Sequence, residues 1–119
     1  MNFTEEHLWL LTEDGVVTVG LTEHGQELLG ALVFVELPEV DSEITKDDVV
    51  AVLEGGEDAR DVLAPLDGEI IEINEELLET PTLLNEDPTG RGWIFKIDAD
   101  DVGELDDLLS ESEYRALVA

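Results

Sequence analysis

The sequence predicts an α+β domain over residues 1–119, mostly β, in which small helices lie at the edges. Three observations lead to this fold class. Short apolar runs rich in β-branched residues recur along the chain, separated by Gly, Pro, Asn and Asp. Helical spacing is confined to two short stretches, residues 22–30 and 105–118. A chain of 119 residues with 43% hydrophobic residues suits one domain with a packed core.

The first elements are a hairpin and a helix. Residues 7–19 predict a β-hairpin, because the Glu-Asp-Gly turn at 13–15 joins an apolar run to a β-branched run. Thr22 stands where a helix N-cap belongs, since its side chain can accept a hydrogen bond from the first turn. Gly30 then ends the helix, because glycine tolerates the left-handed backbone common at that position.

The middle of the chain holds two predicted strands and a polar segment. Residues 32–37 form a nearly continuous apolar run that Pro38 ends, and residues 49–53 form a second run. The segment Gly55–Asp61 is polar and begins with two glycines. We therefore expect a flexible tip between two strands at this point.

The second half begins with a turn that leads into a strand at residues 67–73. Pro and Gly residues then predict an irregular stretch over residues 81–90. The strand predicted at residues 92–97 alternates so that three apolar side chains share one face: Trp93, Phe95 and Ile97. In total the pattern predicts about seven short strands.

The C-terminal end is predicted to be helical. Leu105, Leu108 and Leu109 have helical spacing. Ser110 and Glu113 follow as a capping-box pattern, in which the serine and the glutamate satisfy each other's backbone N–H groups. A final short helix is therefore expected to begin after Ser110.

The charge balance is extreme, with 5 Lys and Arg residues against 32 Asp and Glu residues and a formal net charge of −27. The acidic residues alternate with apolar ones, which indicates a folded body with an acidic coat. A polyanion repels phosphate groups, so we expect no binding to nucleic acid or to a membrane surface. Adaptation to a salty cytoplasm and deliberate supercharging both fit this coat.

The start of the chain lacks the basic and apolar regions of a signal peptide, and no apolar run reaches the roughly 18 residues of a membrane span. We therefore expect a cytoplasmic protein. The absence of cysteine excludes disulfides, thiol nucleophiles and thiolate metal sites.

Few residues suggest catalysis or metal binding. His7 and His24 lie in different predicted elements without a ligand partner at metal-site spacing, and the chain has no phosphate loop or nucleophile elbow. The segment Asp98–Asp101 with Glu104 fits a calcium loop only loosely, because Gly103 is misplaced for one. The sequence therefore predicts neither an enzyme nor a metal centre.

Two long motifs lie in the first half of the chain. Residues 19–30 read V-G-L-T-E-H-G-Q-E-L-L-G, and residues 32–40 read L-V-F-V-E-L-P-E-V. These motifs resemble the glycine cleavage system H protein family. The resemblance continues at residues 64–70, 84–88 and 92–97, in the same order, and covers nearly the whole chain.

This resemblance implies a lipoyl-domain-like fold, a flattened barrel or sandwich (the barrel-sandwich hybrid) with short peripheral helices and a C-terminal helix. It also implies a carrier and not an enzyme. In the family, a lysine at a hairpin tip bears lipoate and carries an aminomethyl group during glycine decarboxylation. The implied protein partners are the glycine decarboxylase, the aminomethyltransferase, the lipoamide dehydrogenase or a lipoate ligase.

The chain departs from the family pattern at that tip. Where the family reads E-S-V-K-A-A-S-D, residues 54–61 read E-G-G-E-D-A-R-D, so Glu57 stands at the position of the lipoyl lysine. A carboxylate cannot accept lipoate through an amide bond. Arg60 cannot replace the lysine either, because its guanidinium stays protonated and is a poor nucleophile. We therefore expect an exposed, unmodified Glu57 and no lipoate. The expected hairpin tip and partner surface comprises Glu54, Gly55, Gly56, Asp58, Arg60, Asp61 and His24.

Three hypotheses stay open at this point. The chain is a non-lipoylated homologue with a binding or regulatory role, or it is an ordinary H protein with a Lys-to-Glu substitution at the lipoylation site. In the third hypothesis it is an acidic cation-binding module, built on the tip carboxylates Glu54, Glu57, Asp58 and Asp61. Against that hypothesis stands the simpler interpretation of these carboxylates as a solvated acidic turn.

Overall fold

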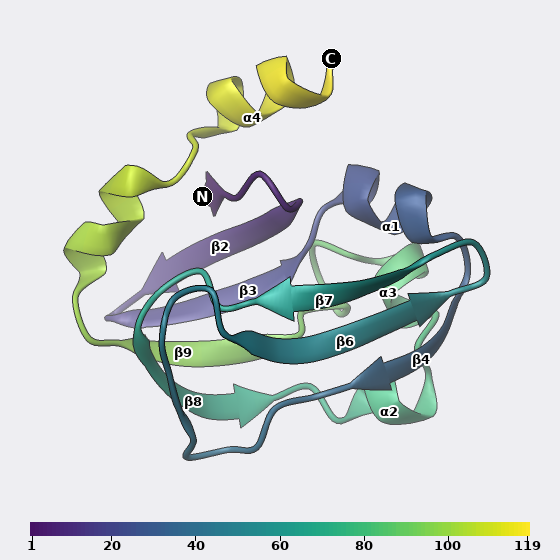
Figure 1. Cartoon of the computed structure of the whole chain (residues 1–119), viewed down its shortest axis with the longest axis horizontal. Helices are drawn as coiled ribbons and strands as arrows, with labels where there is room; N and C mark the ends of the chain where they lie inside the picture. The colour runs from purple at the N-terminus through teal and green to yellow at the C-terminus, as the bar shows by residue number, and fades with distance from the viewer.

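Two antiparallel β-sheets face each other in the computed structural model, which describes residues 1–119 (Figure 1). The larger sheet has the strand order β1-β2-β3-β9-β8-β5 and the smaller one β4-β6-β7. The strands of the larger sheet are β1 (Asn2–Phe3), β2 (Leu8–Glu13), β3 (Val16–Leu21), β5 (Glu43–Ile44), β8 (Gly68–Ile73) and β9 (Phe95–Ala99). Those of the smaller sheet are β4 (Leu32–Glu36), β6 (Val49–Gly55) and β7 (Ala59–Leu63).

Short helices complete the chain. They are α1 (Glu23–Leu29), α2 (Glu76–Glu79), α3 (Leu83–Glu86), the 3₁₀ helix η1 (Val102–Asp107) and α4 (Glu111–Val118). The mostly-β α+β class and the C-terminal helix are thereby confirmed. No strand pairing joins the two sheets, so the fold is a sandwich and not a closed barrel.

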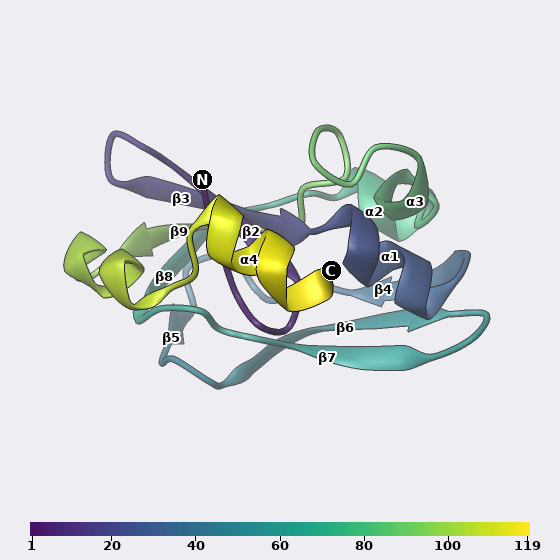
Figure 2. The ribbon, with the colours of Figure 1, turned by 90° about the horizontal axis from the view of Figure 1, so that it is seen from above.

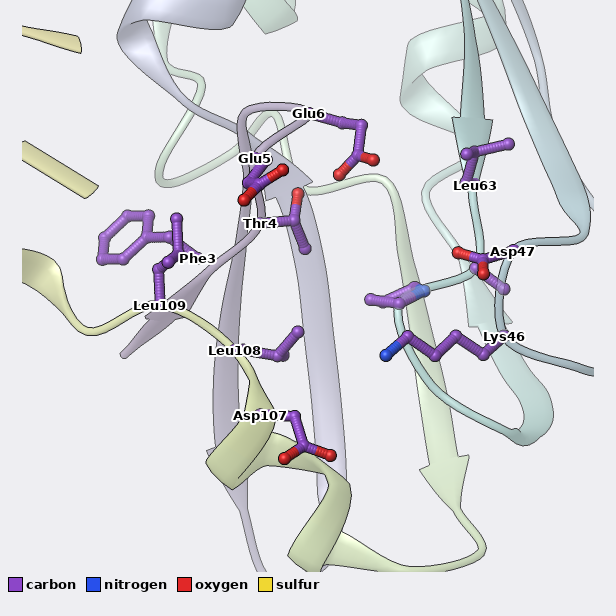
Figure 3. Close-up of a pocket in the computed structure, with 12 residues that line it drawn as sticks. Phe3, Thr4, Glu5, Glu6, Lys46, Asp47, Leu63, Asp107, Leu108 and Leu109 are labelled. Atoms are coloured by element: carbon purple, nitrogen blue, oxygen red, sulfur yellow. The ribbon is translucent and has the colours of Figure 1, made fainter. Parts of the chain in front are cut away.

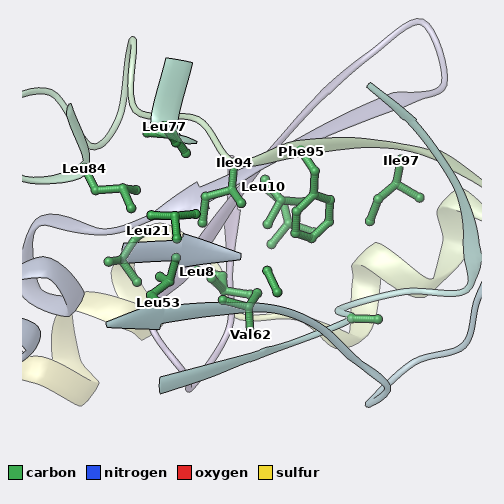
Figure 4. Close-up of a cluster of buried hydrophobic side chains, with 14 of the residues drawn as sticks. Leu8, Leu10, Leu21, Leu53, Val62, Leu77, Leu84, Ile94, Phe95 and Ile97 are labelled. Carbon is green, nitrogen blue, oxygen red and sulfur yellow. The ribbon is translucent and has the colours of Figure 1, made fainter. Parts of the chain in front are cut away.

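The core fills the space between the sheets (Figure 4). Phe95 and Leu10 reach it from the larger sheet, and Leu53 and Val62 reach it from the smaller one. Phe95, Leu10 and Leu53 are completely buried, and burying one such side chain contributes about 1.5–3 kcal/mol. The core therefore holds the two layers together without disulfides.

The predicted hairpin turn and the predicted ends of the first helix are confirmed. Asp14 and Gly15 both have positive φ, 51° and 81°, as the tight turn between β2 and β3 requires. Thr22 caps α1, because its Oγ1 accepts a hydrogen bond of 3.1 Å from the N–H of Gly25. Gly30 ends the helix with φ 75°.

A second, smaller cluster attaches the C-terminal helix to the sheet. The ring of Tyr114 stacks on that of Phe3 at 4.8 Å between centroids, and buried Trp9 completes the cluster. Ser110 and Glu113 form the predicted capping box at the start of α4. The helical spacing at 105–109 proves to be the 3₁₀ helix η1, which ends before Leu109 bridges to Phe3.

Four details of the prediction are wrong. The chain has nine strands and not about seven, because β1 and β5 are two residues long. The stretch 81–90 contains α3 and is not wholly irregular. The last strand begins at Phe95 and not at residue 92, and Trp93 packs against the cluster of Phe3, Trp9 and Tyr114 instead of sharing the core face of Phe95.

The expected flexible tip over Gly55–Asp61 is also corrected. Gly55 belongs to β6 and Ala59–Asp61 to β7, so the connecting turn is confined to residues 56–58.

No helix of the chain combines the length and the hydrophobicity that a membrane crossing needs.

Candidate functional site

The apex of the β6–β7 hairpin is the central feature of the candidate site. Glu54 and Ala59 are its last paired residues, and the N–H of Gly55 donates to the carbonyl of Asp58 at 2.8 Å. Glu57 lies in the turn between them and is exposed. This matches the expectation that Glu57 stands in solvent at a hairpin apex.

The apex is docked on the C-terminal end of α1. The N–H of Gly56 donates to the carbonyl of Ala31 at 3.0 Å, and the N–H of Glu57 donates to the carbonyl of Leu29 at 3.1 Å. A Cβ atom at Gly55 would overlap the Leu29 carbonyl oxygen, so only glycine permits this approach. The turn is therefore fixed by backbone contacts. Its side chains at residues 57 and 58 are exposed and can contact a partner.

Two amide side chains hold the receiving segment in place. Asn85 accepts a hydrogen bond of 2.8 Å from the N–H of Leu32 and donates to the carbonyl of Gly30 at 2.9 Å and to Oε1 of Gln26 at 2.7 Å. Gln26 is buried on α1 and Asn85 lies on α3, so these bonds fix α3 against the end of α1. Both residues belong to the motifs at 19–30 and 84–88, which gives those motifs a structural reason.

The charged residues of the hairpin make few contacts within the chain. Glu54 and Asp61 are exposed on β6 and β7, and neither takes part in an ion pair. Asp58 accepts a hydrogen bond of 2.9 Å from the N–H of Ala59. Arg60 reaches back to the start of the chain, where its Nη1 donates to the carbonyl of Glu6 at 3.3 Å.

His24 does not join the apex. It lies beside His7, with ring centroids 4.8 Å apart. Nδ1 of His7 is hydrogen-bonded to the hydroxyl of Tyr114 at 2.8 Å, and that hydroxyl is also bonded to Oγ1 of Thr22 at 2.7 Å. No sequence pattern indicates this cluster of side chains, because Tyr114 is 107 residues away from His7.

Two residues of this cluster, His7 and Tyr114, have shifted pKa values. Burial lowers the pKa of His7, and the nearby positive groups His24 and Arg60 lower it further against the opposing charge of Glu6. Burial raises the pKa of Tyr114, and the hydrogen bond between Tyr114 and Thr22 partly offsets this rise. His7 is therefore favoured in its neutral form at the junction of α1 and α4.

A cleft lies at the end of β6 that is remote from the hairpin apex. Its volume is about 170 Å³, and Figure 3 shows Lys46 and Asp47 on one side and Thr4 and Asp107 on the other. Because Lys46 precedes β6 and the hairpin apex follows it, this cleft contains none of the expected tip residues.

No group of three or more His, Asp or Glu side chains is arranged to hold a metal ion. The carboxylates of the tip therefore do not form a ligand set, and the cation-binding hypothesis gains no support from the geometry. Asp101 instead caps η1, because its Oδ1 accepts a hydrogen bond of 2.8 Å from the N–H of Gly103.

Comparison with known proteins decides the family. The model of the family described as glycine cleavage H-protein matches residues 1–119, the whole chain. The chain belongs to the glycine cleavage H-protein family. Members of this family are carrier proteins of the glycine cleavage system and are not themselves catalytic.

Individual relatives agree with this assignment. The glycine cleavage system H protein of Thermotoga maritima is 50% identical over 98% of this chain and 94% of its own length. The H protein of Escherichia coli O7:K1 is 49% identical over 99% of this chain and 92% of its own. A crystal structure of the H protein from Mycobacterium marinum superposes with a TM-score of 0.87, at 36% identity, covering 97% of this chain and 93% of that one.

The lysines of this H-protein homologue both lie away from the apex. Lys46 stands before β6, at the cleft of Figure 3. Lys96 lies within β9, 3.6 Å from a carboxylate oxygen of Glu72 and 5.1 Å from the centre of the Trp93 ring. The hairpin itself carries carboxylates, glycines and Arg60, and no amine.

Proposed function

We propose that residues 1–119 form an H-protein-like domain that binds components of the glycine cleavage system without carrying lipoate. The observation that carries this proposal is the exposed carboxylate of Glu57 at the hairpin apex, where the family pattern has its lipoyl lysine. Lipoate is joined to a lysine through an amide, and a carboxylate offers no amine for that bond. The residues of this apex therefore do not fit the cofactor.

The preserved scaffold around the apex supports a binding role. Gly55, Asn85 and Gln26 hold the turn on the end of α1 through backbone and amide hydrogen bonds. This arrangement presents Glu57 at a defined position even though that residue is no acceptor. The docked turn is thus available to an enzyme that recognises the shape of the family's tip.

The partners we propose are those of the family: the glycine decarboxylase, the aminomethyltransferase, the lipoamide dehydrogenase or a lipoate ligase. A net charge of −27 steers the chain toward positively charged partner surfaces and increases the rate of encounter. A ligase that binds the tip without modifying it would be held in an unproductive complex, which would make this protein an inhibitor. We propose the cytoplasm as the compartment of these encounters.

The same intact turn favours a second candidate function, that of an ordinary H protein in which Glu57 has replaced the lipoyl lysine. If Glu57 is a substitution in an otherwise ordinary H protein, restoring lysine restores the acceptor on a scaffold that is already in place. Under neither candidate does the present chain carry lipoate. The two candidates differ in whether binding or carriage is the role of the scaffold, and both place the acceptor position at residue 57.

The test is lipoylation in vitro with a purified lipoate ligase, lipoate and ATP, followed by intact mass. Three chains are compared: the wild type, Glu57→Lys, and the matched control Asp58→Lys, which places the same amine one residue further along the turn. We expect modification of Glu57→Lys, and none of the wild type or of Asp58→Lys.

The other outcomes are equally informative. Modification of the wild type would overturn the proposal of an unmodified homologue. Modification of Asp58→Lys in preference to Glu57→Lys would show that residue 57 is not the acceptor position. If neither variant is modified, the tip is no longer recognised by the ligase, and the proposed ligase partner is wrong.

A further inference from the structure

The outer face of the three-stranded sheet is uncovered. Seen from above in Figure 2, the helices lie above β6 and β7, and none lies beneath them; Figure 1 views the same strands from the open side. Ala51 and Leu53 of β6 point into the core, so their neighbours Val52 and Glu54 point outward. A sheet face without a covering helix meets solvent or a partner.

Two rows of paired residues cross this face. Phe34, Glu54 and Ala59 are partners in one row, and Glu36, Val52 and Asp61 are partners in the next. Cross-strand partners share a face of the sheet, so the rows form a chequerboard of apolar and acidic side chains. We call these residues the outer sheet patch: Phe34, Glu36, Val52, Glu54, Ala59 and Asp61.

A β-bulge exposes the aromatic residue of the patch. The register of β4 against β6 shifts between Leu32 and Phe34, and as a result both Val33 and Phe34 are turned outward. Their exposed fractions are 65% and 50%. Exposed aromatic residues of this kind are enriched where proteins dock.

The acidic side chains of the patch have no partner within the chain. Every ion pair of the protein involves another carboxylate, namely Glu72, Glu76 or Glu111. The one cation of the hairpin, Arg60, is paired across the sheet with buried Leu53, and its guanidinium contacts the carbonyl of Glu6. The patch is therefore apolar at its bulge and negatively charged around it, with no compensating cation.

We propose that the outer sheet patch docks a protein partner through a basic surface. Lysine or arginine side chains of the partner form ion pairs with Glu36, Glu54 and Asp61. An apolar side chain of the partner, between those cations, packs on Phe34. A second copy of this chain is the less suitable occupant, because each copy carries a charge of −27 and would bring further carboxylates to the face. The patch shares Glu54 and Asp61 with the expected partner surface and extends it across the sheet to Phe34 and Glu36. The inference goes beyond the proposed function because it needs no particular residue at position 57.

The probe is a short synthetic peptide that alternates lysine with leucine, and its control has serine in place of every leucine. Each is titrated into the ¹⁵N-labelled full chain at about 150 mM salt, where attraction beyond about 8 Å is screened. We expect the leucine peptide to bind at least about tenfold more tightly than the serine peptide, a difference of about 1.4 kcal/mol. Its amide shift changes should centre on β4, β6 and β7.

Matched variants separate the patch from the general acidic coat. Phe34→Ser should weaken the leucine peptide about tenfold, whereas Leu117→Ser, at a residue of α4 that is also 50% exposed, should leave it unchanged. Removing three charges as Glu36→Gln, Glu54→Gln and Asp61→Asn should weaken binding more than removing three elsewhere, as Glu13→Gln, Asp100→Asn and Asp106→Asn. All six of these carboxylates are exposed.

Two results would overturn the proposal. One is a set of shift changes spread over the whole surface, with equal affinity for the two peptides and for the two triple variants. The other is a dimer in sedimentation equilibrium that Phe34→Ser dissociates, because the occupant of the patch would then be a second copy.

Discussion

Replacing Asn85 by alanine tests whether the hairpin apex depends on the amide contacts behind it. The substitution removes the acceptor of the Leu32 N–H and the donor to the Gly30 carbonyl and to Oε1 of Gln26. Leu32 and Gln26 are 2% and 9% exposed, so water cannot readily replace the lost partner. The end of α1, on which Gly56 and Glu57 are docked, then loses its fixed position.

The expected loss of stability follows from these contacts. A buried polar group left without its partner costs about 1–3 kcal/mol, and two such groups are left here in addition to the partly exposed Gly30 carbonyl. We therefore expect the free energy of unfolding to fall by about 2–6 kcal/mol. For a chain of this size that corresponds to a decrease in Tm of about 8–24 °C.

The assay is urea denaturation at neutral pH together with native-state hydrogen exchange. The neighbouring substitution Glu86→Ala removes an exposed side chain without a hydrogen bond and should change the free energy by less than about 0.5 kcal/mol. In Asn85→Ala, exchange of the Gly56 and Glu57 amides should accelerate more than that of the amides in the β2–β3 hairpin.

Equal stability of Asn85→Ala and Glu86→Ala would refute the reasoning about the buried amide contacts. Unchanged protection of the Gly56 and Glu57 amides would refute the dependence of the apex on them, even if the protein as a whole were destabilised.

Three further predictions follow. Gly55→Ala places a methyl group against the Leu29 carbonyl, and the free energy of unfolding measured in urea should fall by about 1–3 kcal/mol. In Gly56→Ala the new methyl group has no neighbour closer than 3.9 Å, so stability should hardly change. Equal losses in the two variants would contradict the docked turn. Because the pKa of His7 is lowered from 6.5, its contribution to stability is present above pH 6.5 and is lost as the pH falls through the lower folded value. His7→Gln should therefore reduce the loss of Tm between about pH 7.5 and 5.5, and an identical loss in both proteins would contradict this. Ser110→Ala removes the cap of α4 and should lower the free energy of unfolding by about 1 kcal/mol; no change would show that α4 does not depend on it.

The sequence predicted the parts of this fold that short-range chemistry decides. The turn at Asp14 and Gly15, the cap at Thr22 and the capping box at Ser110 each involve residues a few positions apart, and all are confirmed. The exposed position of Glu57 follows instead from the family resemblance, which places the lipoyl lysine at a hairpin tip.

The sequence did not predict what depends on distant contacts. The motif at residues 84–88 includes Asn85 but does not reveal its role, because Asn85 fixes the end of α1 across 53 to 59 residues of sequence. The flexible tip expected from two glycines is instead a docked turn, because Gly55 allows the backbone to approach Leu29. The bulge that exposes Phe34 depends on the register of two strands, which an apolar run alone does not specify.

The most direct measurement of the central claim is the intact mass of the wild-type protein purified from a host supplied with lipoate and expressing a lipoate ligase. The account predicts the mass of the unmodified sequence, 13.1 kDa, with Glu57→Lys from the same host shifted by one lipoyl group. A lipoyl adduct on the wild-type chain, located by peptide mapping to Lys46, Lys96 or any other residue, would contradict it.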